Sequence, residues 1–234
     1  KFKLKCQERR CFPVLLGGRL RAALTRCGRS SSVSVAWGKV QTFETFRSLK
    51  EYVRMLLDGP RSCLLVIDVQ ERLAPAIHDG DSVTARIALL LRVAAQLEVP
   101  VLASEQAPER LGPTREAIAA LLPSGARFAK TLFSWPRDPR FASCRQVLNG
   151  RRPILMGMET HVCVLQSALA LIDLGYAPVA VADACGSRRA SDHAAGLARM
   201  KAKGVEIATS EMVVFEWLGS SDHAAFRDVI GLIK

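Results

Sequence analysis

The stretch CLLVIDVQ, residues 63–70, decides the fold of this chain. Six of its first seven residues are apolar, which predicts a strand over residues 63–69 that is buried on both faces. Asp68 interrupts this apolar run near its end. A carboxylate buried among apolar side chains needs a partner, so the strand itself indicates either a functional acid or a structural ion pair or helix cap.

Apolar segments and helical patterns alternate after this strand. Strands are expected at residues 101–104, 127–130, 153–157, 178–182 and 205–208, and helices at residues 83–97, 114–122, 140–148, 161–174 and 191–203, with two more helices after them. Strands that are apolar on both faces and alternate with helices predict an α/β fold, a parallel sheet sandwiched by helices. In such sheets, ligands bind at the carboxyl ends of the strands.

The composition excludes several classes of protein. The 234 residues are 49% hydrophobic, enough for one full core, and the length alone allows two domains. No apolar run approaches the roughly 18 residues that a membrane helix needs. The seven cysteines form no CxxC pair and no zinc-spaced cluster with histidine, so we expect free thiols in a reducing, cytoplasmic compartment. No metal and no cofactor is expected.

Positive charge is concentrated in the N-terminal part. Residues 1–60 hold 13 Lys/Arg and 4 Asp/Glu, whereas the remainder holds 20 and 18, so the net charge of +11 gives no reason to expect nucleic acid as a partner. Residues 19–34 are rich in Arg and Ser without an acid, as in a mitochondrial transit peptide. We favour a basic, disordered or non-native extension over residues 1–54 and a globular domain over residues 55–234, starting at Met55.

Two more strand ends carry reactive side chains. Lys130 precedes the aromatic stretch TLFSWP, residues 131–136, and its alternative is a solvated lysine at a strand edge. Cys163 opens an apolar helix, where the helix dipole favours the thiolate and free backbone N–H groups can hold an oxyanion. The alternative for Cys163 is a small buried residue that packs the helix on the sheet. Cys185 is a weaker second candidate, and His161 is expected to face away from Cys163.

Taken together, LLVIDVQ (residues 64–70), Lys130 and ETHVCV (residues 159–164) resemble the isochorismatase-like cysteine hydrolases. The similarity extends through residues 181–184 and 209–211, covers roughly residues 60–234, and is greatest for the branch called isochorismatase domain-containing proteins. It implies a three-layer αβα sandwich with a mainly parallel six-stranded sheet, a small-molecule substrate and a homo-oligomer.

The resemblance also implies roles for particular residues. Asp68, Lys130 and Cys163 would form a catalytic triad, with a cis peptide at Met158–Glu159 and the N–H groups of Glu159 and Cys163 as the oxyanion hole. Cys163 would attack the carbonyl carbon of a small amide to give a thioester, while Asp68 accepts the thiol proton. The expected substrate pocket contains Gln70, Phe133, Trp135 and Thr160, with core packing as the alternative for the two aromatic residues.

Two departures from the superfamily narrow the expected chemistry. Nicotinamidases carry an Asp-x-His metal motif where residues 104–108 read SEQAP, so nicotinamide is not expected as the substrate. Isochorismatases proper lack a cysteine at the nucleophile position, so Cys163 argues against vinyl ether hydrolysis. The alternative to an enzyme is a catalytically silent interaction protein with the same fold.

Overall fold

The computed structural model of the protein describes residues 5–7, 10–12 and 56–233. The chain divides into two units, Lys1–Arg47 and Ser48–Lys234. In the first unit, the described residues are β1 (Lys5–Gln7) and β2 (Arg10–Phe12), which pair antiparallel where the sequence predicts no strand. The boundary expected at Met55 and the transit-like segment of residues 19–34 lie outside the described residues.

The second unit is built on one six-stranded sheet with the strand order β5-β4-β3-β6-β7-β8, and every pair is parallel. The strands are β3 (Ser62–Ile67), β4 (Val101–Gln106), β5 (Arg127–Lys130), β6 (Arg152–Met158), β7 (Val179–Gly186) and β8 (Glu206–Ala208). The predicted three-layer fold class is confirmed. β4 and β7 run further than their apolar residues indicate, and this extension of β4 reaches the candidate site.

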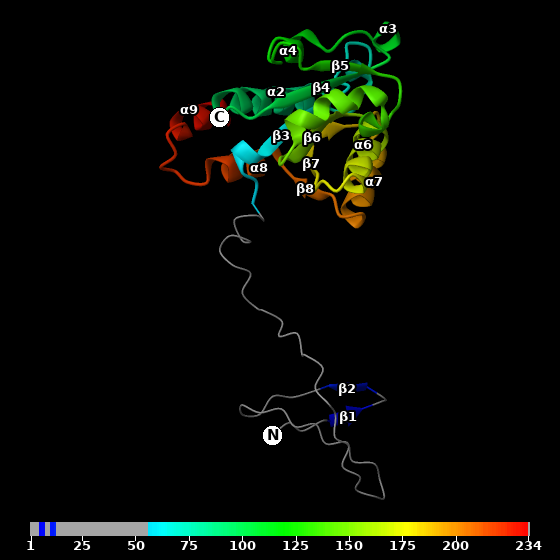
Figure 1. Ribbon diagram of the computed structural model, residues 1–234, viewed down its shortest axis with the longest axis vertical. Coiled ribbons are helices and arrows are strands. Elements are labelled where there is room, and N and C mark those ends of the chain that lie inside the picture. Colours follow the sequence, from blue (N-terminus) through cyan, green and yellow to red (C-terminus); the bar gives the residue numbers. More distant parts are fainter. Residues whose placement is uncertain (1–4, 8–9, 13–55, 234) are drawn as a thin grey trace, which may run out of the picture. The chain divides into compact units, whose positions relative to one another are not determined.

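Helices cover both faces of the sheet (Figure 1). One face carries α2 (Gly80–Gln96), α8 (Ser210–Leu218) and α9 (Phe226–Ile233), and the other carries α6 (Leu165–Asp173) and α7 (Ala190–Ala202). The side chains of β3 alternate between two hydrophobic clusters: Leu64 and Val66 pack on the α2 side, and Leu65 and Ile67 on the α6 side. A central strand is therefore apolar throughout because each face has its own core.

Shorter elements connect these layers. They are the 3₁₀ turns Gly59–Arg61, Ala74–Ala76, Trp135–Arg137 and Pro139–Cys144, the helices α3 (Pro108–Leu111), α4 (Glu116–Ala119) and α5 (Arg145–Leu148), and a π-helical turn at Thr160–Val164. The helix predicted over residues 140–148 is only partly α-helical. Pro139 and the Asp138 side chain, which accepts a hydrogen bond from the Arg140 N–H, start a 3₁₀ turn there instead.

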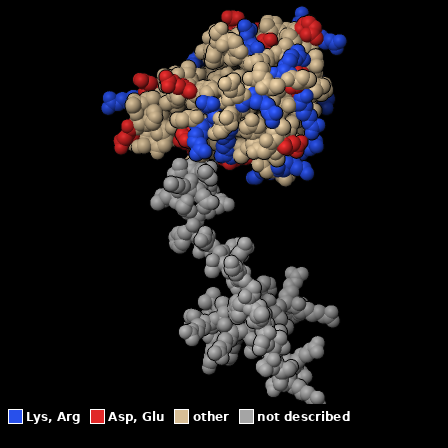
Figure 2. Space-filling model, viewed as in Figure 1, with Lys and Arg blue, Asp and Glu red and all other residues tan. Residues whose placement is uncertain are grey.

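Charge is mixed on the surface of the second unit. Figure 2 shows Lys and Arg side chains next to Asp and Glu side chains on the face in view. Among the described residues, no helix is both long enough and apolar enough to span a membrane.

Candidate active site

Reactive residues gather at the carboxyl edge of the sheet. Asp68 directly follows β3, Lys130 is the last residue of β5, and Glu159 directly follows β6. All of these strands are parallel, so their carboxyl ends lie at the same edge. β4 lies between β3 and β5, and its last residues, Ser104 to Gln106, separate Asp68 from Lys130 in the sheet.

Asp68 and Lys130 form a buried ion pair. The Lys130 Nζ lies 2.7 Å from the Asp68 Oδ2, and both side chains are 0% exposed. The Ser104 hydroxyl donates a hydrogen bond to the other carboxylate oxygen of Asp68 at 2.7 Å, and Nζ donates to the Gln106 Oε1 at 2.7 Å. Ser104 and Gln106 were not predicted as site residues from the sequence, although their place at the end of the neighbouring strand is a signal that indicates them. Both charges are thus hydrogen-bonded, the condition under which a buried pair is tolerated.

The Cys163 thiol lies against this pair and is 6% exposed. Burial raises its pKa, the Asp68 charge raises the pKa further, and the Lys130 ammonium opposes both effects. Burial and the Asp68 charge therefore act against the thiolate that a helix N-terminus favours.

The turn before Cys163 depends on a glycine. Gly157 has φ +129, and a Cβ there would lie 2.0 Å from the carbonyl oxygen of Ile67. The β6 backbone at Gly157 therefore lies very close to the β3 backbone at Ile67. Ile67 is one residue before Asp68, and Gly157 is six residues before Cys163. The peptide bond between Met158 and Glu159 is cis, as the resemblance implied.

Backbone donors are available in this turn. The Glu159 carbonyl accepts hydrogen bonds from the N–H groups of Val162 (3.1 Å) and Val164 (3.2 Å), which shapes the π-helical turn. The Glu159 N–H has no protein acceptor among the described residues. The Glu159 carboxylate accepts from the N–H and the Nε of Arg188, each at 3.0 Å, so this side chain is turned to its own partner.

The four expected pocket residues differ in exposure. Phe133 is 54% exposed, whereas Gln70, Trp135 and Thr160 are 0% exposed. The Gln70 amide binds the backbone of Gln106 and Gly112.

Trp135 contacts Phe128 and Phe141 in the core on the α6 side, which agrees with the core-packing alternative. The Phe133 carbonyl lies 3.5 Å from the Lys130 Nζ, so its loop borders the buried pair. Direct contact of these residues with a substrate stays a prediction.

Two histidines flank the same turn. The His193 Nδ1 lies 2.9 Å from the hydroxyl oxygen of Thr160, and burial lowers the pKa of His193, with a smaller effect from His78. The His161 Nδ1 lies 3.0 Å from the Ser187 hydroxyl oxygen. The contact of His193 with Thr160 was not predicted from the sequence. Within residues 56–233 and the two short strands, no group of three or more His, Cys, Asp or Glu side chains is arranged to hold a metal ion.

A parallel αβα sandwich with an acid, an amine and a thiol at its carboxyl edge defines the class of hydrolase-like α/β proteins. The family model described as the isochorismatase domain matches residues 62–212. This chain belongs to the isochorismatase family.

Similar proteins agree with this assignment. Isochorismatase domain-containing protein 2 of Homo sapiens is 37% identical over 175 residues, which are 74% of this chain and 83% of that protein. The protein of the same name from Xenopus laevis is 35% identical over 176 residues, 75% of this chain and 85% of that protein. A solved structure described as the MAR1 ribonuclease from Caenorhabditis elegans has 31% identity and a TM-score of 0.71, covering 76% of this chain and 92% of its own.

Proposed function

We propose that this protein is a cysteine hydrolase that cleaves a small amide or a related carbonyl compound through a thioester on Cys163. The observation that carries the proposal is the buried Asp68–Lys130 pair, with its 2.7 Å contact and the Cys163 thiol lying against it. A fully desolvated ion pair contributes little net stability, and titratable groups with perturbed pKa values cluster at functional sites.

The proposed reaction begins from the neutral thiol, because its pKa is raised in the resting protein. As the sulfur attacks the carbonyl carbon, the thiol proton passes to the Asp68 carboxylate and the carbonyl oxygen becomes an oxyanion. The N–H groups of Glu159 and Cys163 are the proposed oxyanion donors, and each such donor typically contributes on the order of 3 kcal/mol. The Lys130 ammonium, 2.7 Å from the Asp68 Oδ2, holds the carboxylate in place before attack.

The intermediate then collapses with cleavage of the C–N bond. Asp68 returns its proton to the leaving nitrogen, which departs as ammonia or an amine and leaves a thioester on Cys163. Water adds to the thioester carbon and gives up a proton to Asp68. The carboxylic acid is released, and the proton restores the Cys163 thiol.

The test is a turnover screen of small amides with the full chain. Released ammonia or amine is measured, and mass spectrometry of the protein detects the acyl adduct. Cys163→Ala should abolish both signals. Cys185→Ala is the matched control because Cys185 is also buried, at 2% exposure, and its thiol donates to the Leu155 carbonyl. Turnover that persists in Cys163→Ala would exclude the proposed nucleophile.

The competing function is that of an interaction protein that has kept the fold without the activity. It predicts no turnover and no adduct with any amide, even though the fold is intact by circular dichroism. The name of the Caenorhabditis elegans neighbour makes RNA a necessary further substrate in the screen. RNA cleavage that depends on Cys163, without amide turnover, would contradict amide hydrolysis as the function.

Self-association is a separate part of the proposal. Leu132 and Phe133, 46% and 54% exposed, lie on the loop that follows Lys130, so a second copy could bury them beside the site. Light scattering of the full chain measures the number of copies. A strictly monomeric protein with turnover would show that a second copy is not required.

A further inference from the structure

A cavity of about 580 Å³ opens at the edge of the sheet opposite Asp68. It lies where β3, β6, β7 and β8 begin, since Arg61 precedes β3, Arg152 opens β6 and Glu206 opens β8. The length of β3, about 20 Å at 3.3 Å per residue, separates it from the candidate active site. Its volume falls in the range of small-molecule sites. The charged residues of its lining are Asp58, Arg61, Arg151, Arg152 and Glu206.

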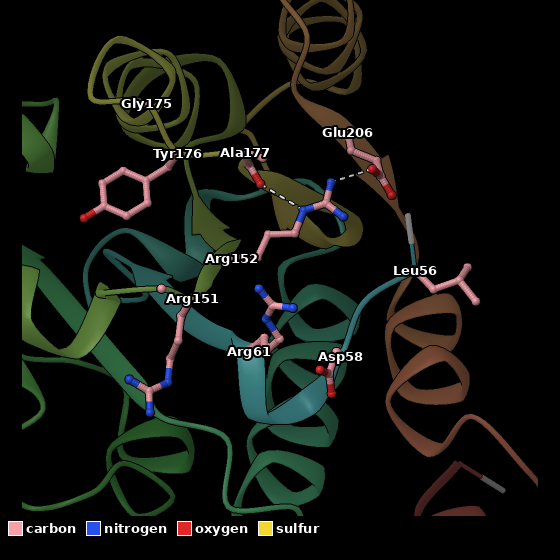
Figure 3. Close-up of a pocket in the computed structure, with 10 residues that line it drawn as sticks. Leu56, Asp58, Arg61, Arg151, Arg152, Gly175, Tyr176, Ala177 and Glu206 are labelled. Atoms are coloured by element: carbon pink, nitrogen blue, oxygen red, sulfur yellow. Dashed lines mark hydrogen bonds and ion pairs between the residues drawn. The ribbon is translucent and has the colours of Figure 1, made fainter. Parts of the chain in front are cut away.

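Three arginines line the cavity, and their donors are only partly used. Arg152 donates from Nη2 to the Glu206 carboxylate and from Nε to the Ala177 carbonyl. The side chain of Arg61 makes no hydrogen bond or ion pair with any described residue. Figure 3 shows the guanidinium groups of Arg61 and Arg152 turned into the same space, without a carboxylate between them.

Arg151 adds a third positive charge. One of its terminal nitrogens, Nη1, donates to the Val147 carbonyl at 2.8 Å, while its buried Nε has no partner within the described residues. Against these three cations the lining holds two acids, and one of them, Glu206, is already paired with Arg152. The lining therefore holds three cations against two acids, and the Arg61 guanidinium has no acceptor among the described residues.

We propose that this cavity binds a small molecule that carries a phosphate group, held between the guanidinium groups of Arg61 and Arg152. A phosphate carries close to two negative charges and three terminal oxygens, and the planar fork of arginine matches them in pairs. The remaining volume, bordered by Tyr176 and Leu56, accepts the organic part of a phosphate ester. This site uses none of the residues of the proposed hydrolase and is separate from it.

The test is calorimetric titration of the full-length protein with inorganic phosphate and with glycerol 3-phosphate, in buffer that contains 150 mM sodium chloride. Both ligands should bind saturably with one site per chain, the ester more tightly. Arg61→Gln should weaken phosphate binding at least tenfold. Arg61→Lys keeps the charge but loses the planar guanidinium, so its affinity should lie between those of the parent protein and Arg61→Gln. Arg92→Gln removes an exposed charge on α2 away from the cavity and should leave binding within twofold. Cys163→Ala should bind as the parent does.

Several results would overturn the proposal. They are the absence of saturable binding to the parent protein, equal weakening by Arg92→Gln, and acetate binding as tightly as phosphate. If Arg61→Gln lowers the melting temperature, its weaker binding could reflect unfolding, and the test then uses Arg61→Lys with an unchanged melting temperature. A phosphate affinity of Arg61→Lys equal to that of the parent protein would exclude the guanidinium as a ligand. Phosphate binding is also measured in Cys163→Ala, which should lose amide turnover. Binding that stays intact in this variant shows that the phosphate site does not depend on the proposed hydrolase function.

Discussion

The Lys130 Nζ lies 2.7 Å from the Asp68 Oδ2, although the two residues are 62 positions apart and neither side chain is exposed. Each charge is buried only because the other is there. Ser104 and Gln106, from the strand between them, satisfy the remaining polar atoms on either side.

Removing one partner of this pair should destabilise the protein more than removing both. Lys130→Met or Asp68→Asn alone changes the charge balance of a desolvated site and should lower the free energy of unfolding by about 3–5 kcal/mol. The double variant should recover a large part of this loss. Urea unfolding of the four proteins in a double-mutant cycle measures the coupling, and strict additivity would show that the pair is not coupled.

Gly157→Ala should damage the fold much more than Gly204→Ala. Both glycines have positive φ, but a Cβ at Gly157 would meet the Ile67 carbonyl at 2.0 Å, whereas one at Gly204 meets nothing within 4 Å. Gly204→Ala should therefore cost only the left-handed backbone, about 1–2 kcal/mol. Gly157→Ala should cost more than about 4 kcal/mol or prevent folding. Equal melting temperatures would mean that the β3–β6 contact relaxes freely.

Stability should fall as the pH rises above about 9. Burial raises the pKa of Cys63 from 9.0 to about 12 and that of Cys144 to about 11, so the folded protein keeps protons that the unfolded chain releases. The stabilisation is complete below pH 9 and is lost as the pH rises towards the folded values.

Each such thiol should contribute about 1.4 kcal/mol per pH unit to this loss. Unfolding in reducing buffer from pH 8 to 11 measures the slope. Cys63→Ala should make the slope shallower by that amount, and an unchanged slope would contradict the raised pKa.

Acid should also weaken the protein, through His193. Burial lowers the pKa of His193 below its usual 6.5, so its share of the stability is present above pH 6.5 and is lost as the pH falls. Protonation also opposes the contact of Nδ1 with the Thr160 hydroxyl if that hydroxyl donates. His193→Gln should reduce the dependence of the unfolding free energy on pH between 5 and 7. His223→Gln, outside the site, should leave it unchanged, and the same slope in both variants would refute the role of His193.

The fold class could be predicted from the sequence because burial leaves a local pattern. CLLVIDVQ is apolar on both faces, and β3 does lie in the middle of the sheet with a core on each side. Element ends were less predictable. β4 continues through Glu105 and Gln106, which are polar, because β5 supplies their pairing after the register with β3 has ended at Ser104.

The candidate site was predictable only in part. Asp68, Lys130 and Cys163 stand at element ends in the sequence, and the structure brings all three together. Their hydrogen-bond partners were not predictable, since Ser104 and Gln106 look like ordinary polar residues until the strand order places them between Asp68 and Lys130.

The sequence by itself determined which segments form the six-stranded sheet and which reactive side chains stand at the ends of its strands, since periodicity and apolar runs are local properties. The tertiary structure alone decided the surroundings of the Cys163 thiol, because the desolvation and the nearby Asp68 charge that raise its pKa depend on everything packed around the sulfur. It also decided where Arg61, Arg152 and Glu206 meet, since a cavity forms from segments that only the strand order brings together.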